Sequence, residues 1–323
     1  MKMLLYIEGL KTYFFTEAGI VKAVDGIDFE VGTNEIVGLV GESGSGKTVT
    51  AYSVLRTVPR PGRIVGGKIL FRSEDLMVKT EESMREIRGG EISMIFQDPS
   101  SSLNPLFTVG DQLVEVIRVH QQISKSEAFE KAIKLLDRSG ISEPEARINA
   151  YPHELSGGMK QRVAIARAIS SEPSLLFADE PTTNLDVTIQ AQVLDLLREL
   201  GEQTNMSMVM ITHDMGIIAE MTERVTVLYA GMVSEMAETD IIFKSPVHPY
   251  TEALLNAVPS IDRKRELRVI PGNIPNLIFP PTGCRFHPRC LYAKDICSKK
   301  VPIIEEAEEG HKIACHRWRE INP

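Results

Sequence analysis

A glycine-rich segment near the N-terminus, GESGSGKT, has the residue types and spacing that bind phosphate groups. It matches the pattern G-x-x-x-x-G-K-[ST], in which glycines let backbone N–H groups turn toward phosphate oxygens. Lys47 would bridge the β- and γ-phosphates of a nucleotide, and Thr48 would hold Mg²⁺. The alternative is a plain Gly/Ser turn in front of a helix. The predicted binding loop consists of Gly41, Glu42, Ser43, Gly44, Ser45, Gly46, Lys47 and Thr48.

A second chemical feature is the pair of carboxylates that closes the apolar run SLLFADE. Such a run predicts a buried strand, and ligands of open α/β sheets bind at the carboxyl ends of the strands. Asp179 would reach Mg²⁺ through water, and Glu180 could orient and deprotonate an attacking water. The alternative is a surface carboxylate pair, which the phosphate loop upstream makes the weaker interpretation.

All four cysteines lie in the last 40 residues, with the spacing C-x5-C-x6-C-x17-C over Cys284, Cys290, Cys297 and Cys315. A zinc ribbon would show two C-x2-C pairs, and this segment shows none. Iron–sulfur clusters also take four thiolates. Free thiols or disulfides are the remaining interpretation. His287, His311 and His316 lie nearby, but four thiolates make histidine ligands unnecessary.

The composition limits the class of protein. The 323 residues are 43% apolar and carry a net charge of −8, so bulk attraction to nucleic acid is not expected. No apolar stretch reaches the roughly 18 residues of a membrane span, and the start MKMLLYIEGLKTYFF does not resemble a signal peptide. We expect a soluble cytoplasmic protein, in which structural disulfides are rare.

The elements that would position these residues alternate between strands and helices. AVDGIDFEV alternates apolar and polar residues as a half-buried strand does. Buried strands are predicted at 35–41, 91–97, 174–180, 206–213 and 223–231. Residues 188–200 have helical periodicity, and 105–170 are predicted to be helical without a strand. The pattern indicates an α/β domain with a mainly parallel sheet.

After about residue 245 the pattern becomes irregular. Residues 245–260 could hold one helix, and beyond them prolines and glycines are frequent. The acidic run EEAEEG is interpreted as solvated surface.

The segment LSGGMKQRVAIARAI, at 155–169, resembles the signature of ABC-type ATPases. Ser156 is expected to cap a helix, and Gly157 and Gly158 to expose N–H groups at its start. In that family two such domains pair head to tail, and each signature covers the γ-phosphate bound by the other. The resemblance therefore implies that Ser156, Gly157 and Gly158 act on the nucleotide of a partner.

Other residues match the family in order. Gln97 matches the glutamine that reaches metal and water, and His213 the switch histidine that contacts the γ-phosphate. Asp186 matches the loop that faces the partner subunit. Asn184 stands where alanine is common, a mild departure. An aromatic residue should stack on adenine, and either Phe14 or Tyr13 would fit.

Longer stretches, such as YPHELSGGM and SPVHPYTEALLNAVP, resemble ATP-binding subunits of dipeptide and oligopeptide importers. The resemblance implies a P-loop NTPase of ABC type, with an antiparallel β edge and a helical subdomain at about 100–170. It places a nucleotide-binding domain at 1–245 and an irregular, cysteine-rich extension at 246–323. It also implies ATP and Mg²⁺, with a [4Fe–4S] cluster on the four cysteines and zinc as the second choice.

The same resemblance implies partners and a location. They are two membrane permeases, an extracytoplasmic peptide-binding protein and a second ATPase, either a paralogue or a copy of this chain. The protein would sit on the cytoplasmic face of the cell membrane, without nucleic acid. Three alternatives stay open: import of another small solute such as a metal complex, a soluble non-transport ABC ATPase, and an iron–sulfur redox sensor with a vestigial ATPase. Intact Lys47, Asp179, Glu180 and His213 disfavour the sensor.

Overall fold

The computed structural model describes residues 2–257 and 270–321. The chain forms two compact units. The first comprises Met1–Gly32, Ile36–Val78 and Met210–Pro323, and the second Thr33–Glu35 and Lys79–Val209. These units are defined by compactness, whereas the predicted domains 1–245 and 246–323 follow the organisation of the family and stay a prediction.

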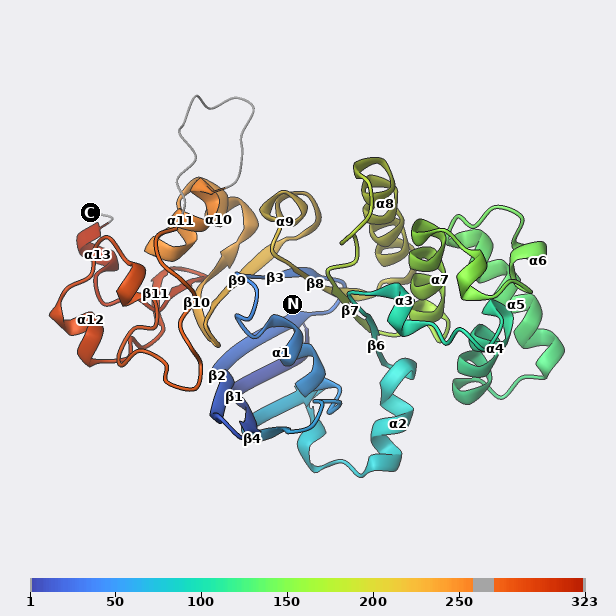
Figure 1. The fold of residues 1–323 in the computed structure, drawn as a ribbon, viewed down its shortest axis with the longest axis horizontal. Coiled ribbons are helices and arrows are strands. Elements are labelled where there is room, and N and C mark those ends of the chain that lie inside the picture. The colour runs from blue at the N-terminus through green and yellow to red at the C-terminus, as the bar shows by residue number, and fades with distance from the viewer. Residues whose placement is uncertain (1, 258–269, 322–323) are drawn as a thin grey trace. The chain divides into compact units, whose positions relative to one another are not determined.

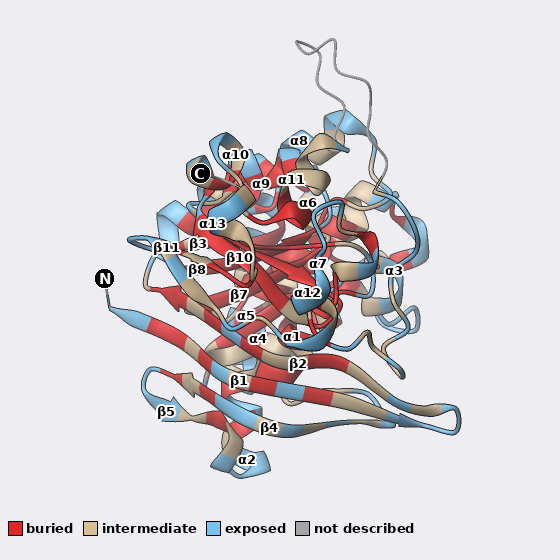
Figure 2. Ribbon diagram, turned by 90° about the vertical axis from the view of Figure 1, so that its left-hand side faces the viewer, coloured by how far each residue is buried: buried red, intermediate tan, exposed pale blue. Residues whose placement is uncertain are grey.

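The first unit begins with an antiparallel sheet in the order β2-β1-β4-β5, of which β1 and β2 are drawn in blue in Figure 1. Buried and exposed residues alternate along β1, as the banded ribbon of Figure 2 shows, because one face of the sheet packs on the core. This sheet is the antiparallel edge that the sequence predicted. Its strands are β1 (Met3–Thr16), β2 (Gly19–Gly32), β4 (Gly62–Phe71) and β5 (Glu74–Asp75).

A second set of strands in this unit carries the segments that matter for function. β3 (Ile36–Val40) pairs in parallel with β9 (Arg224–Tyr229), and both are almost wholly buried. β10 (Met232–Glu238) then pairs antiparallel with β9. The helices of this unit are α1 (Lys47–Val54), η1 (Leu76–Val78), α9 (Met215–Met221), α10 (Thr239–Lys244), α11 (Pro249–Asn256), η3 (His287–Arg289), α12 (Asp295–Lys299) and α13 (Trp318–Ile321).

The C-terminal segment adds two strands to the edge of this sheet. β12 (His311–Ile313) pairs with β10, and β11 (Glu305–Glu308) pairs with β12. Four residues of the acidic run EEAEEG form β11, and none of its six residues is buried, so the interpretation as solvated surface is confirmed. The expected helix in 245–260 is α11, and residues 258–260 of that stretch lie outside the described residues.

The second unit contains a parallel pair of buried strands, β6 (Ile92–Ile95) and β7 (Leu175–Asp179). The expectation of a helical stretch at 105–170 is confirmed, and side-chain caps at Thr108 and Ser124 begin two of its helices. The helices are α2 (Glu81–Gly90), α3 (Pro99–Ser102), α4 (Val109–His120), α5 (Lys125–Arg138), α6 (Pro144–Arg147), η2 (Pro152–Glu154), α7 (Gly157–Ile169) and α8 (Val187–Thr204).

β8 (Ser207–Thr212) begins in the second unit and ends in the first, so its carboxyl end belongs with β3 and β9. Within the described ranges, no helix is both long and apolar enough to cross a membrane.

Candidate functional site

The phosphate loop connects β3 to α1 in the first unit, which is the strand–loop–helix arrangement that its sequence requires. Two of its positions accept only glycine. Gly41 has φ +152°, and a Cβ there would lie 2.1 Å from the Leu228 carbonyl oxygen. Gly46 has φ +106°, and a Cβ there would lie 2.5 Å from the Ala23 carbonyl oxygen. The loop therefore packs closely against the backbone at Leu228 and Ala23.

The outer side of this loop is suited to a phosphate group. Ser43 and Gly44 are exposed, and a Cβ built on Gly44 would meet nothing within 4 Å. The Lys47 ammonium donates hydrogen bonds to the carbonyl oxygens of Gly41, at 2.7 Å, and Glu42, at 3.0 Å. Lys47 is thus held at the loop, and the helix that it begins places its N-terminus there too. These residues fit a nucleotide polyphosphate with its Mg²⁺ at Thr48.

In the second unit, β7 delivers the two carboxylates to its carboxyl end. Asp179 is buried, with 2% of its surface exposed, and Glu180 follows in a left-handed conformation with φ +45°. Glu180 Oε2 accepts hydrogen bonds from Gln97 Nε2, at 2.7 Å, and from Thr183 Oγ1, at 2.9 Å. The structure thus brings Gln97 and Glu180 together from segments 83 residues apart. A carboxylate held by two donors at a fixed place can orient a water molecule.

The signature segment forms the start of α7. Ser156 caps this helix, as predicted, by accepting a hydrogen bond from the Met159 N–H at 3.3 Å. A Cβ on Gly157 would meet nothing within 4 Å, so the backbone at this helix start is open to a ligand. Asp186 caps α8 by accepting from the Ile189 N–H at 3.0 Å. Asn184 has φ +64°, a conformation that asparagine adopts more readily than alanine.

The remaining predicted nucleotide contacts lie in the first unit. His213 is exposed directly after β8, and Asp214 behind it caps α9. The Tyr13 hydroxyl donates a hydrogen bond to Asp25 at 2.5 Å, whereas Phe14 lies beside Gly62. Neither contact assigns the adenine to one ring, and both stay candidates.

The four cysteines lie together around one small cavity of about 20 Å³, and all four are free thiols. Burial first, and the neighbouring cysteines to a smaller extent, raise the pKa of the Cys284 thiol to about 12. Burial also raises the pKa values of Cys290 and Cys315. Protons must therefore leave before these sulfurs can act as ligands.

A single-ion site is not apparent here. Within 2–257 and 270–321, no group of three or more His, Cys, Asp or Glu side chains is arranged to hold one metal ion. The nearby histidines have other partners. His316 Nε2 lies 2.8 Å from the Lys300 carbonyl oxygen, and His311 Nε2 lies 2.7 Å from Glu235 Oε1.

The cysteine segment also contacts the phosphate loop, which the sequence did not predict. Arg289 makes a two-pronged ion pair with Glu42, with Nη1–Oε2 2.6 Å and Nη2–Oε1 3.0 Å. The Glu42 N–H donates to the Tyr250 hydroxyl of α11 at 2.9 Å. Two residues of the C-terminal region therefore hold the second residue of the loop.

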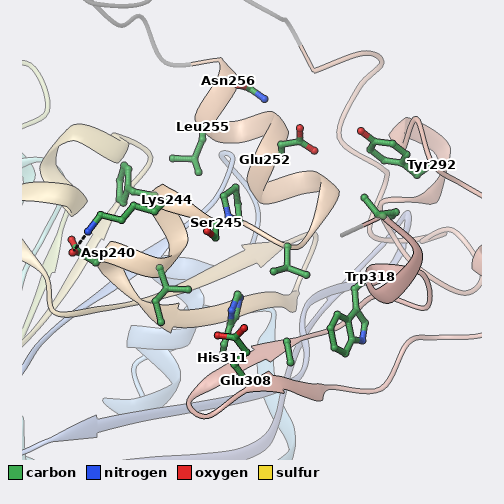
Figure 3. A pocket seen from close by; sticks show the side chains of 16 residues that line it. Asp240, Lys244, Ser245, Glu252, Leu255, Asn256, Tyr292, Glu308, His311 and Trp318 are labelled. Atoms are coloured by element: carbon green, nitrogen blue, oxygen red, sulfur yellow. Dashed lines mark hydrogen bonds and ion pairs between the residues drawn. The ribbon is translucent and has the colours of Figure 1, made fainter. Parts of the chain in front are cut away.

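A larger cavity, of about 980 Å³, lies elsewhere in the first unit (Figure 3). Trp318, Tyr292 and Glu252 project around it, and His311 lies in its lower part in this view. None of the predicted nucleotide or cysteine ligands lines it. It borders the cysteine cavity, because Tyr292 and Ile321 line both.

Comparison with known families agrees with these features. Residues 24–183 match the family model described as ABC transporter. Residues 234–297 match the model described as oligopeptide/dipeptide transporter, C-terminal region. The second match covers most of the segment that runs from β10 through α11 to Cys297.

Similar proteins and structures point the same way. The chain is 46% identical to the dipeptide transport ATP-binding protein of Escherichia coli (strain K12), over 97% of this chain and 96% of that protein. It is 47% identical to an oligopeptide transport ATP-binding protein of Bacillus subtilis (strain 168), over 99% and 98% respectively. A solved dimeric ATP-binding cassette bound to ADP and Pi has a TM-score of 0.66 at 25% identity, covering 73% of this chain and 99% of that one. The chain belongs to the family of dipeptide and oligopeptide ABC transporter ATP-binding proteins.

Proposed function

We propose that this chain is the ATP-hydrolysing subunit that powers import of dipeptides or oligopeptides through a membrane ABC transporter. One observation carries the proposal: the chain combines an intact phosphate loop with a Glu180 carboxylate held by Gln97. Its similarity to peptide-importer subunits spans nearly its whole length.

Each residue of the site has a distinct role in ATP hydrolysis. Lys47 and the N–H groups of 41–48 bind the β- and γ-phosphates and neutralise charge that develops on them. Glu180 accepts a proton from the attacking water, whose oxygen bonds to the γ-phosphorus as the bond to the bridging oxygen of ADP breaks. Gln97 keeps the Glu180 carboxylate in place, and His213 contacts the γ-phosphate. Thr48, Gln97 and Asp179 would hold Mg²⁺, which would neutralise charge on the phosphates.

Two ATPase subunits would complete each site. Ser156, Gly157 and Gly158 act on the nucleotide of the partner, and Asp186 faces that partner. The exposed backbone at Gly157 supports this role, because an uncovered helix start can receive phosphate from another molecule. The second ATPase is a paralogue or a copy of this chain, and Phe14 or Tyr13 stacks on adenine.

We place the subunit peripherally on the cytoplasmic face of the cell membrane. Residues 1–245 form its nucleotide-binding domain and 246–323 its extension. It works there with two permeases and an extracytoplasmic peptide-binding protein. The test is co-purification with permeases, followed by peptide uptake into proteoliposomes driven by enclosed ATP. Uptake of a metal complex but no peptide would favour the second candidate cargo, and absence of any permease would favour a non-transport ATPase.

We infer that Cys284, Cys290, Cys297 and Cys315 bind one [4Fe–4S] cluster. All four line one cavity, and a [4Fe–4S] cluster takes four cysteine thiolates as its ligands. Metal ligation would stabilise a segment rich in proline and glycine. Anaerobic purification followed by iron and sulfide analysis tests this. Four irons and four sulfides per chain are expected. Stoichiometric zinc without sulfide would instead indicate that the four cysteines bind zinc.

A further inference from the structure

The two arginines that flank the first cysteines extend from the C-terminal segment to the phosphate loop and its support. Arg289 immediately precedes Cys290, and Arg285 immediately follows Cys284. Both are buried, with exposures of 7% for Arg289 and 6% for Arg285. Buried guanidinium groups need partners for their N–H donors, and these two take them from the nucleotide-binding part of the unit.

Arg289 fixes the side chain of Glu42. Its two terminal nitrogens bond to the two carboxylate oxygens, at 2.6 and 3.0 Å, the bidentate geometry that arginine forms with a carboxylate. Arg289 Nη1 also donates to the Tyr229 hydroxyl at 3.2 Å, and its Nε donates to the Pro271 carbonyl oxygen at 2.8 Å. The guanidinium thus has three hydrogen-bonding partners, which restrict its movement and that of the Glu42 side chain.

An aromatic cluster under this ion pair fixes the segment that carries Arg289. Phe286 packs against both Tyr229 of β9 and Tyr250 of α11, with ring centroids 5.1 and 5.3 Å away, and the two tyrosine rings lie 4.6 Å from each other. The Tyr250 hydroxyl accepts the Glu42 N–H. Side chain and backbone of Glu42 are therefore both held by groups that the aromatic cluster positions.

Arg285 stabilises the turn that contacts the phosphate loop. It donates to the Ala230 carbonyl oxygen and forms an ion pair with Asp25. The next residue, Gly231, donates its N–H to the carbonyl oxygen of Ser45 in the phosphate loop at 2.9 Å. The same turn accepts the Asp25 N–H at Gly231, at 2.8 Å. Arg285 thus stabilises the turn on which the middle of the loop rests.

We propose that Arg289 is a positioning residue for the nucleotide site, which holds the phosphate loop through Glu42 in the shape that receives ATP. The proposal rests on the proposed role of 41–48 in ATP binding. All the proposed direct nucleotide ligands lie before residue 214, and through Arg289 the affinity for ATP would depend on the cysteine segment as well. Because Cys284 and Cys290 enclose both arginines, whatever the four thiols bind also stabilises this contact.

The experiment uses the full chain and two readouts. The first is the Kd for a fluorescent mant-labelled ATP, and the second is amide hydrogen exchange of 41–48 without nucleotide. Arg289→Gln is expected to weaken binding about tenfold and to raise exchange in 41–48. Exchange in β6 should not change, because a local clamp does not act on a strand of the second unit. The matched control is Arg319→Gln, an exposed tail arginine paired with Glu305, which should leave Kd within about twofold.

Glu42→Gln and the double variant separate positioning from general folding. If Arg289 acts through Glu42, the double variant should bind ATP no more weakly than the single variant with the higher Kd. The effects of substituting two residues of one contact do not add. Arg289→Lys, which keeps charge but not the two-pronged geometry, should give intermediate binding and serves as the folded substitute if Arg289→Gln does not fold.

Unchanged Kd and unchanged exchange in folded Arg289→Gln, or in Arg289→Lys if only that variant folds, would overturn the proposal. Wild-type protein that binds no ATP would instead refute the proposed function, while the exchange measurement still decides whether Arg289 holds the loop.

Discussion

Glu235 joins the C-terminal segment to the sheet, and replacing it should release that segment. Its side chain is fully buried in β10. The carboxylate accepts hydrogen bonds from the Val247 N–H at 2.7 Å and the His248 N–H at 3.1 Å, and its Oε1 lies 2.7 Å from His311 Nε2. One side chain therefore binds the start of α11 and the strand β12. We expect Glu235→Ala to loosen both.

The size of the effect follows from these contacts. Glu235→Ala removes the acceptor of the buried His248 N–H, and an unsatisfied buried group of this kind costs about 1–3 kcal/mol. It also leaves the buried His311 ring without its hydrogen-bond partner, which costs about a further 1–3 kcal/mol. By contrast, Asp240→Ala removes an exposed i,i+4 pair with Lys244, which contributes about 0–1 kcal/mol. Asp240→Ala is therefore the matched control.

The chain offers a natural probe for this measurement. Trp318 is the single tryptophan, and it lies in α13 of the C-terminal segment, near Glu305. Urea unfolding followed by Trp318 fluorescence should show the midpoint of Glu235→Ala far below that of Asp240→Ala. Equal midpoints for the two variants would refute the reasoning that Glu235 holds the segment.

The pH dependence has a definite sign. Burial alone would raise the pKa of Glu235, but the hydrogen bonds with His311 and from the Val247 N–H help to outweigh it and hold the pKa below its usual 4.5. A carboxylate with a lowered pKa contributes stability that is full above 4.5 and is lost as pH falls through the lowered value. The urea midpoint of the wild type, followed by Trp318 fluorescence, should therefore fall as the pH drops below 4.5. Glu235→Gln should lack this part of the pH dependence.

Three further predictions concern the nucleotide site. Glu180→Gln should keep ATP binding but lower turnover by about 100-fold or more, since the proton acceptor is lost; turnover within a factor of about two of wild type, measured by phosphate release, would contradict its role. Ser156→Arg and Lys47→Ala chains should each be inactive alone, and mixing them should restore part of the activity if one intact composite site forms between two copies of this chain. No recovery on mixing, with activity restored only by a different ATPase subunit, would mean that the partner is a paralogue. Gly46→Ala should weaken mant-ATP binding, because a Cβ would lie 2.5 Å from the Ala23 carbonyl oxygen; an unchanged Kd would contradict this loop geometry.

The parts of the fold that depend on local sequence were predictable. Continuous apolar runs identified β3, β6, β7, β8 and β9, because a strand buried on both faces has no polar alternation. Ser156 could be recognised as a cap, since capping joins residues only three positions apart. The phosphate loop and the carboxylates at the end of β7 belong to the same class, because each is a short segment whose spacing carries the chemistry.

The C-terminal contacts could not be predicted in the same way. β11 and β12 are too short to show periodicity, and β12 pairs with β10 about 80 residues earlier in the chain. Arg289 and Glu42 are 247 residues apart, and a single arginine between proline and cysteine resembles an ordinary surface cation. A signal did exist: the cysteine spacing indicated that this segment is ordered, and a buried arginine needs hydrogen-bond acceptors. Nothing in the sequence indicated which one.

The division of the chain into units gives the Arg289–Glu42 contact a particular consequence. The phosphate loop, α11, the aromatic cluster and the cysteine segment all belong to the first unit, so their contacts do not depend on the placement of the second. Glu180, Gln97 and the signature belong to the second unit. A defect in the cysteine segment should therefore act on nucleotide affinity, through Glu42, and leave the Glu180–Gln97 hydrogen bond intact. Kinetically, Arg289→Gln should raise KM for ATP more than it lowers kcat, whereas Glu180→Gln should lower kcat.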